Sequence, residues 1–138
     1  MKRMADWSAA RLANAQSIWR AARKMPGLRV PEVPPWAVHA AYKCYVAVDR
    51  KALAPGWDRD RIMAGINALG VPCYSGSCSE IYLEKAFDAT PWRPAERLPV
   101  ARELGETSLM FLVHPTLDST HMDQTIAALA TVMEEATC

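Results

Sequence analysis

The stretch that decides the fold is Leu98–Pro115, LPVARELGETSLMFLVHP. Its first half carries apolar residues at the spacing of a short amphipathic helix, and its second half contains the uninterrupted apolar run Leu109–Val113. The run ends at His114-Pro115, and proline cannot continue the hydrogen-bond ladder of a sheet. This pattern predicts a buried strand that follows a helix and ends in an imidazole, and the rest of the chain must cover it.

The composition indicates one folded domain. The chain has 138 residues, of which 51% are hydrophobic, and a net charge of +1. The charges of both signs are interspersed, which argues against a nucleic-acid partner. No apolar run is long enough to span a bilayer and no apolar leader follows the first residues, so we expect a soluble, cytoplasmic protein without a membrane partner. The cysteines lack CxxC spacing and are expected to be reduced thiols: Cys44, Cys73, Cys78 and Cys138.

The first third of the chain predicts a helix, a connector and a strand. Apolar residues on one face favour a helix over residues 4–25. Prolines and Gly27 then predict an extended connector over 26–38, followed by an α+β core over 39–138. Within 39–49 the alternation predicts a strand with one buried face, made of Tyr42, Cys44, Val46 and Val48.

Helix signals then alternate with short strand signals. Asp58 is the expected N-cap of a helix over 59–69, with Ile62, Ile66 and Leu69 on its buried face and Gly70 ending it in a left-handed conformation. A strand over 71–74, a polar loop over 75–79, a helical turn over 80–87 and a surface loop over 88–97 follow. The last helix begins at 118–120, where Thr120 and Asp123 approximate a capping box. The expected fold is α+β, with about three antiparallel or mixed strands backed by helices on one side.

Three patterns could carry chemistry, and each has a stronger ordinary explanation. Cys78 and His114 could form a nucleophilic dyad, but nothing places them together or orients the imidazole. A metal could use the side chains between the last strand and the last helix, although their acidic members suit helix capping better: His114, Asp118, His121 and Asp123. The serine-rich loop 75–79 could hold an anion, but Glu80 at the start of the next turn opposes one. We therefore expect no catalytic, cofactor-binding or metal-binding residue from chemistry alone.

Several short motifs stand in a fixed order along the chain. They are Arg11 with Asn14-Ala15, the proline-rich segment 31–35, His39-x-x-Tyr42 before 46–49, Arg59-Asp60 through 69–71, Leu98-Pro-x-Ala101, and 112–115 ending in His114-Pro115. Taken together they resemble the C-terminal, smaller domain of the DegT/StrS-type sugar aminotransferases, which share the aspartate-aminotransferase fold of pyridoxal phosphate (PLP) enzymes. The resemblance covers nearly the whole chain.

The resemblance implies transfer of an amino group, usually from glutamate, to a nucleotide-linked keto sugar, serving the synthesis of lipopolysaccharide, other polysaccharide or antibiotic sugars. It also implies a homodimer and a large PLP-binding domain that carries the Schiff-base lysine. That domain is not represented in residues 1–138, so the chain alone is expected to be inactive and to bind no PLP. The alternative is a non-catalytic module that binds a nucleotide sugar or another protein.

The resemblance also marks candidate substrate contacts. The family commonly has H-Y-P-x-P-L-H after its G-I strand, and its final histidine reaches the active site. Counted from Gly70, this stretch falls on GSCSEIY, where Ser77 takes the tyrosine position and Tyr82 the histidine position. These departures put the substrate in doubt, whereas His114 matches its motif. Removal from a large partner domain would expose apolar surface, for which Trp7 and Trp36 are the candidates, and would favour self-association.

Overall fold

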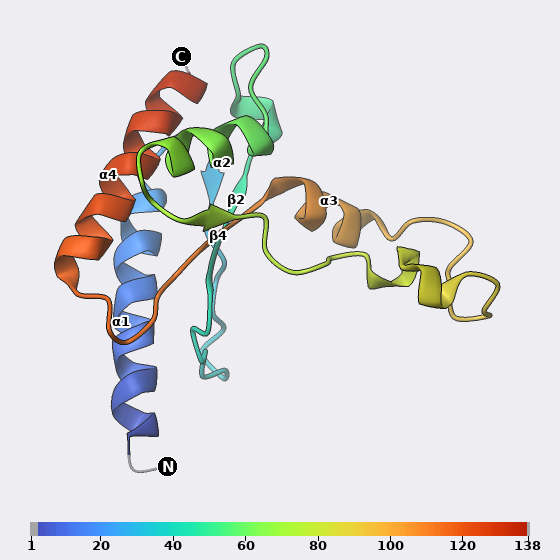
Figure 1. The fold of residues 1–138 in the computed structure, drawn as a ribbon, viewed down its shortest axis with the longest axis horizontal. Helices are drawn as coiled ribbons and strands as arrows, with labels where there is room; N and C mark the ends of the chain where they lie inside the picture. Colours follow the sequence, from blue (N-terminus) through green and yellow to red (C-terminus); the bar gives the residue numbers. More distant parts are fainter. Residues whose placement is uncertain (1–2, 138) are drawn as a thin grey trace.

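The computed structural model describes residues 3–137 and has a mixed α+β architecture (Figure 1). Its α-helices are α1 (Met4–Ala22), α2 (Arg59–Ala68), α3 (Pro99–Thr107) and α4 (Ser119–Ala136). Its strands are β1 (Leu28–Arg29), β2 (Cys44–Val48), β3 (Cys73–Tyr74) and β4 (Ser108–Phe111). Three single turns of 3-10 helix complete it: η1 (Arg50–Ala52), η2 (Ile81–Leu83) and η3 (Lys85–Phe87). Within the described residues, no helix combines the length and apolarity needed to cross a membrane.

The strands form one antiparallel sheet in the order β1-β2-β4-β3. The predicted buried strand, β4, is one of its two central strands, and Phe111 is the register partner of both Cys44 on β2 and Cys73 on β3. The α+β fold is therefore confirmed. The fourth strand, β1, lies inside the predicted connector and pairs with the end of β2, with Leu28 opposite Val48.

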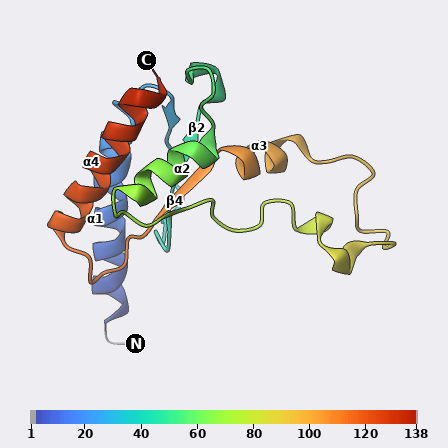
Figure 2. The ribbon, with the colours of Figure 1, turned by 45° about the horizontal axis from the view of Figure 1, so that its top comes forward.

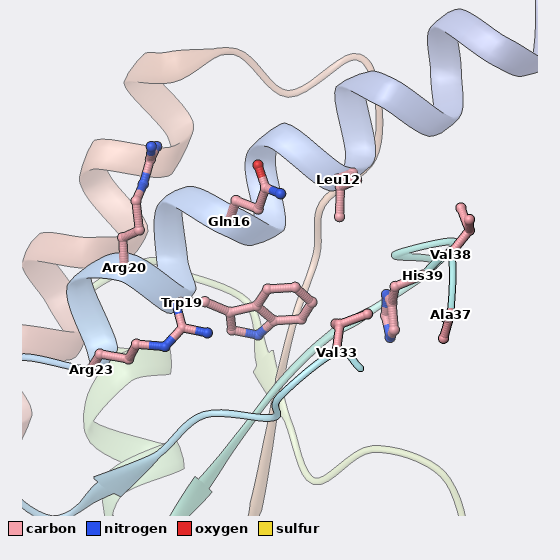
Figure 3. A pocket seen from close by; sticks show the side chains of 9 residues that line it. All are labelled: Leu12, Gln16, Trp19, Arg20, Arg23, Val33, Ala37, Val38 and His39. Carbon is pink, nitrogen blue, oxygen red and sulfur yellow. The ribbon is translucent and has the colours of Figure 1, made fainter. Parts of the chain in front are cut away.

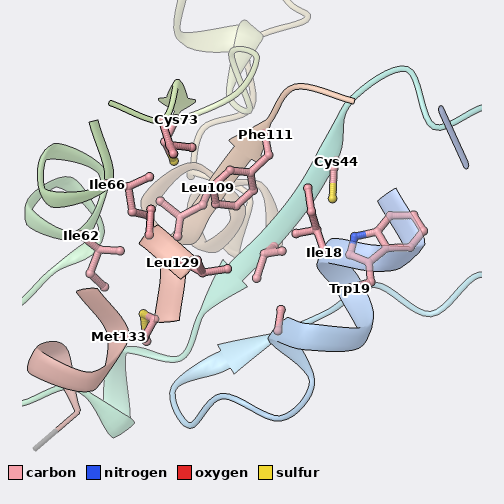
Figure 4. Packing of buried hydrophobic residues seen from close by; sticks show 14 of the residues in the cluster. Ile18, Trp19, Cys44, Ile62, Ile66, Cys73, Leu109, Phe111, Leu129 and Met133 are labelled. Carbon is pink, nitrogen blue, oxygen red and sulfur yellow. The ribbon is translucent and has the colours of Figure 1, made fainter. Parts of the chain in front are cut away.

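One face of the sheet carries the hydrophobic core. Phe111 and Leu109 are fully buried beside Ile66 from α2 and Leu129 from α4 (Figure 4). Ile18 on α1 is also fully buried and closes the other side of the same cluster. Helices α1 and α4 lie side by side and run in the same direction in both views (Figures 1 and 2). The prediction that helices back one side of the sheet is thus correct.

The first helix and the first long strand are both shorter than expected. Helix α1 ends at Ala22 instead of residue 25, because the chain turns ahead of Pro26 and Gly27, and Gly27 has a φ of 75°. Strand β2 begins at Cys44, and the predicted burial of Tyr42 is wrong, since its side chain is 74% exposed. The cause is Ala41, whose φ of 46° interrupts the extended backbone on which the alternation depends.

Capping explains where helices α2 and α4 begin. Asp58 accepts a hydrogen bond from the Arg61 amide at 2.8 Å, as predicted, but Leu69 is the C-cap of α2 and is 53% exposed rather than buried. Gly70 follows with the expected left-handed φ of 81°. At α4 the capping box consists of Asp118 and His121, and not of Thr120 and Asp123. The imidazole Nδ1 takes the position that a glutamate oxygen usually fills, and sequence patterns for capping boxes omit histidine.

Candidate functional site

Residues 75–98, which we call the arm, leave the sheet after β3 and return at the start of α3. Figures 1 and 2 both show the arm, with η2 and η3, extending away from the rest of the fold. The arm contains two of the three predicted contacts, Ser77 and Tyr82. It exposes several large apolar side chains: Ile81, Leu83, Trp92 and Leu98. The contacts that fix the arm to the fold lie at its base, where residues 76–82 and 97–98 meet the sheet and one another.

The first contact at the base is a close approach of Gly76 to Tyr45 on β2. Gly76 has a φ of 94°, and a Cβ atom there would lie 2.6 Å from Cε1 of the Tyr45 ring. Glycine alone adopts this positive φ without strain and has no Cβ atom to collide with the ring. The next residue, Ser77, is exposed and lines a cavity of about 340 Å³ together with residues 39–43 and Tyr45. Ser77 thus lies beside the turn that precedes β2.

The second contact at the base is a cluster of Glu80, Tyr82 and Arg97. The Arg97 guanidinium donates to both Glu80 carboxylate oxygens, with Nε 2.9 Å from Oε1. The Tyr82 hydroxyl donates to Glu80 Oε1 at 2.7 Å and accepts from the Leu98 amide at 2.9 Å. Hydrogen bonds from Arg97 and then Tyr82 lower the pKa of the Glu80 carboxyl to about 2. The cluster joins the segment of the arm that leaves the sheet to the segment that returns to α3.

The third predicted contact, His114, is not brought near the other two. Strand β3 runs antiparallel to β4, so the chain after Tyr74 heads toward Ser108, whereas His114 lies beyond the opposite end of β4. The His114 Nδ1 atom lies 2.8 Å from the Thr116 hydroxyl, and its carbonyl accepts from the Asn14 side chain at 3.4 Å. The His114 backbone is therefore held against α1, and its ring is bonded to Thr116 and not to the arm.

This separation also removes the nucleophilic dyad. Cys78 Sγ lies 3.5 Å from Glu84 Oε1, on the arm, and has no contact with His114. Loop 75–79 is not followed by a helix that could hold an anion, because η2 is a single turn and the Glu80 carboxylate precedes it. The metal alternative is likewise not assembled: Asp118 and His121 bond to each other, and the described residues contain no cluster of three His, Cys, Asp or Glu side chains suited to a metal.

The described side chains do not fit a complete PLP site. Such a site needs a lysine for the Schiff base, an acidic group for the pyridine nitrogen and donors for the phosphate. Lys43 lines the cavity that also holds Ser77, and no acidic residue lines that cavity with it. Lys24, Lys51 and Lys85 line none of five well-formed cavities of the described structure. We therefore derive no catalytic step through PLP on this chain.

Comparison with known proteins then assigns the family. Residues 1–130 match the DegT/DnrJ/EryC1/StrS aminotransferase family. The chain belongs to this family. It is 53% identical to an aminotransferase from Psychrobacter cryohalolentis, with a TM-score of 0.89 over 96% of the chain and 36% of that protein. No curated protein matches the chain closely enough to count as a relative.

Two further solved structures share the fold. DesV from S. venezuelae, solved with a ketimine intermediate, is 20% identical with a TM-score of 0.81, over 96% of this chain and 33% of that one. The aminotransferase TlmJ from Streptoalloteichus hindustanus is 19% identical with a TM-score of 0.80, over 96% and 33%. The chain thus spans about a third of the length of these members of the aminotransferase fold.

Three residues of the site were missed by sequence reasoning. Glu80 counted only as a group that opposes an anion, and Arg97 lay in a loop with no assigned role. They are 17 positions apart, one near each end of the arm, and no periodicity connects residues at that separation. Tyr45 was also missed, although the single glycine of loop 75–79 marked a place where the backbone could approach another group.

We expect Gly76→Ala to destabilise the protein more than Gly70→Ala. Both glycines have positive φ, so both variants lose about 1–2 kcal/mol to left-handed strain. Only Gly76 faces a side chain, the Tyr45 ring, whereas nothing lies within 4 Å of a Cβ at Gly70. Chemical unfolding should show the larger loss for Gly76→Ala, with shifted Tyr45 ring resonances. Equal losses and an unmoved ring would show that the approach does not hold the arm.

The Glu80 carboxyl should titrate near pH 2, and Arg97→Met should move its pKa up toward the ordinary glutamate value of 4.5. Because the folded pKa lies below the unfolded one, the cluster contributes its full stability above about pH 4.5 and loses it as pH falls toward 2. Carboxyl NMR shifts measure the midpoint. Arg93→Met is the control, since Arg93 pairs with Asp88 instead. A midpoint unaffected by Arg97→Met would contradict the assigned cause.

Proposed function

We propose that the chain is the C-terminal, small domain of a PLP-dependent aminotransferase that transfers an amino group from glutamate to a nucleotide-linked keto sugar. The observation that carries the proposal is the 53% identity to an aminotransferase over 96% of the chain. The motif order and the match of residues 1–130 support it. The product would enter lipopolysaccharide, other polysaccharide or antibiotic synthesis.

The arm is the part of the chain that meets substrate in this proposal. Its exposed apolar side chains require cover by protein, while the exposed Ser77 hydroxyl is free to donate to a ligand. The Tyr82 hydroxyl already makes two hydrogen bonds within the arm, so it presents its ring more readily than its oxygen. His114 lies beyond the other end of β4. We therefore assign Ser77 and His114 to different parts of the ligand or to sites in different subunits.

The chain also carries surface suited to a homodimer or to self-association. Trp36 is 86% exposed and Trp7 is 43% exposed, as expected for these two residues. Trp92 on the arm is exposed as well. Exposed aromatic side chains are enriched where proteins bind one another. Sedimentation velocity of the chain should show a dimer that dissociates in Trp36→Ser but persists in Glu32→Ser, a control on the same connector. A monomer at high concentration would contradict self-association.

The enzymatic proposal is tested on the longer polypeptide, whose reading frame upstream should encode the PLP domain. That protein should transfer an amino group from glutamate to a nucleotide-linked keto sugar. Ser77→Ala should lower kcat/KM about tenfold, the effect of one hydrogen bond to substrate. Ser119→Ala is the matched control, because Ser119 lies at the start of α4, off the arm.

Two results would overturn parts of this proposal. A full-length protein without aminotransferase activity, whose Ser77–Tyr82 amides nevertheless shift with a nucleotide sugar, would favour the non-catalytic binding module. The isolated chain can also be mixed with PLP and washed. A Schiff-base absorbance band that survives washing would contradict the expectation that this chain binds no PLP on its own. An unchanged kcat/KM in Ser77→Ala would remove Ser77 from the substrate contacts while leaving the activity itself in place.

A further inference from the structure

The cavity of about 340 Å³ at the base of the arm lies against the turn that precedes β2. Residues 39–43, Tyr45 and Ser77 line it, and its volume is at the small end of the range for small-molecule sites. A larger cavity between α1 and the connector shares only His39 with it (Figure 3). The larger cavity offers no aromatic face, because Trp19 is 3% exposed and packs in the core. The smaller cavity adjoins a candidate substrate contact.

Three side chains of the smaller cavity carry donors that no acceptor in the described structure takes up. The Lys43 ammonium takes part in none of the ion pairs there. The hydroxyls of Tyr45 and Ser77 make no hydrogen bond to another described residue, and the group of Tyr45 that bonds to Trp19 is its main-chain carbonyl. Because no acidic residue lines the cavity, these donors are available to a ligand.

Positive charge gathers around the ring of Tyr42, which also lines the cavity. The Lys43 Nζ atom lies 5.9 Å from the centroid of this ring, and the Arg11 Cζ atom, on α1, lies 6.0 Å from it. Neither cation pairs with a carboxylate among the described residues. The Tyr42 side chain is 74% exposed, so solutes reach this group directly. Uncompensated cations beside an open cavity attract anions.

The backbone fixes these groups before a ligand arrives. Ala41 is fully buried with a φ of 46°, and its amide donates to His39 Nδ1 at 3.0 Å, which folds the turn beside the cavity. Because Nδ1 accepts this bond, the neutral imidazole carries its proton on Nε2 and adds another donor to the lining. On the other side, the approach of Gly76 to the Tyr45 ring brings Ser77 to β2. A site fixed in advance loses little entropy on binding.

The set of donors distinguishes between anions. A phosphoryl group presents three acceptor oxygens and carries more than one negative charge near neutral pH. Lysine binds phosphate as a point charge, while hydroxyl groups donate to the remaining oxygens. A carboxylate has two oxygens and would leave at least one of the donors from Lys43, Tyr45 and Ser77 unused. The cavity therefore matches a phosphoryl group better than a carboxylate.

We propose that this cavity binds a phosphoryl group, with Lys43 balancing its charge and the hydroxyls of Tyr45 and Ser77 donating to its oxygens. The inference rests on the proposed function for the source of that group, because a nucleotide-linked sugar carries two phosphoryl groups in its diphosphate. Free phosphate has the same chemistry, and the test separates the two sources. Arg11 contributes attraction over a longer range, since it does not line the cavity.

The test titrates the chain with uridine 5′-diphosphate (UDP), uridine and inorganic phosphate, and follows the backbone amide resonances of Lys43 and Ser77 by NMR. UDP should shift both resonances in a saturable manner. Uridine has no phosphoryl group and should bind at least about tenfold more weakly. Inorganic phosphate should shift the same resonances with an affinity about tenfold below that of UDP, because it lacks the second phosphoryl group. Equal affinities for phosphate and UDP would overturn the nucleotide as the source.

Two variants remove the donors one at a time. Lys43→Gln should weaken UDP binding about tenfold, and Tyr45→Phe about fivefold, because the second variant loses the hydroxyl but keeps the ring beside Gly76. Lys51→Gln on η1 and Tyr74→Phe on β3 are the matched controls, since they remove the same groups outside the cavity lining. Each control should change the affinity less than about twofold.

The inference is overturned if uridine binds as tightly as UDP. It is also overturned if Lys43→Gln and Lys51→Gln weaken binding equally, because general attraction to positive charge would then explain it. Aminotransferase activity of the longer polypeptide without a UDP-induced shift at Lys43 would remove this site alone. UDP binding at Lys43 and Ser77 in a polypeptide without that activity would instead contradict the proposed reaction and leave the phosphoryl site in place.

Discussion

The pairing of β4 with a strand on each side is the constraint on which the rest of this structure depends. Phe111 is opposite both Cys44 and Cys73, so one residue fixes the register of β2 and β3 together. Because side chains alternate along a strand, the same register sends Leu109, Phe111 and Val113 to the helical side. A slip of one position would turn all three into solvent and expose the surfaces of α1, α2 and α4 that now cover them.

The polarity of β4 also decides which candidate residues can act together. The arm begins where β3 leaves the start of β4, and His114 follows the end of β4. Sequence motifs place Ser77, Tyr82 and His114 in one functional group, but the sheet sends them to two ends of a strand. Any ligand that both the arm and His114 contact must extend along the sheet, or else the two regions serve different sites.

The predictable parts of the fold are those that local patterns determine. Apolar periodicity located β4 and the buried face of α2, and Asp58 and Gly70 marked the two ends of that helix, because capping involves residues three or four positions apart. Ala41 could not be predicted, since alanine gives no signal for a positive φ that the His39 imidazole stabilises through the Ala41 amide. Glu80 and Arg97 were missed for a related reason: their ion pair depends on how a long loop returns.

The arm is tied to the core by few groups, chiefly the approach of Gly76 to Tyr45 and that of Ser79 to Gly105 on α3, while the Glu80 cluster joins the two halves of the arm to each other. Segments with few buried contacts open at a much lower free energy than the core and do so as a unit. Backbone amides along 81–97 should therefore exchange their hydrogens with solvent long before those of β4. A surface that reorders at so small a cost can fit itself to a larger partner while the sheet and its helices stay intact.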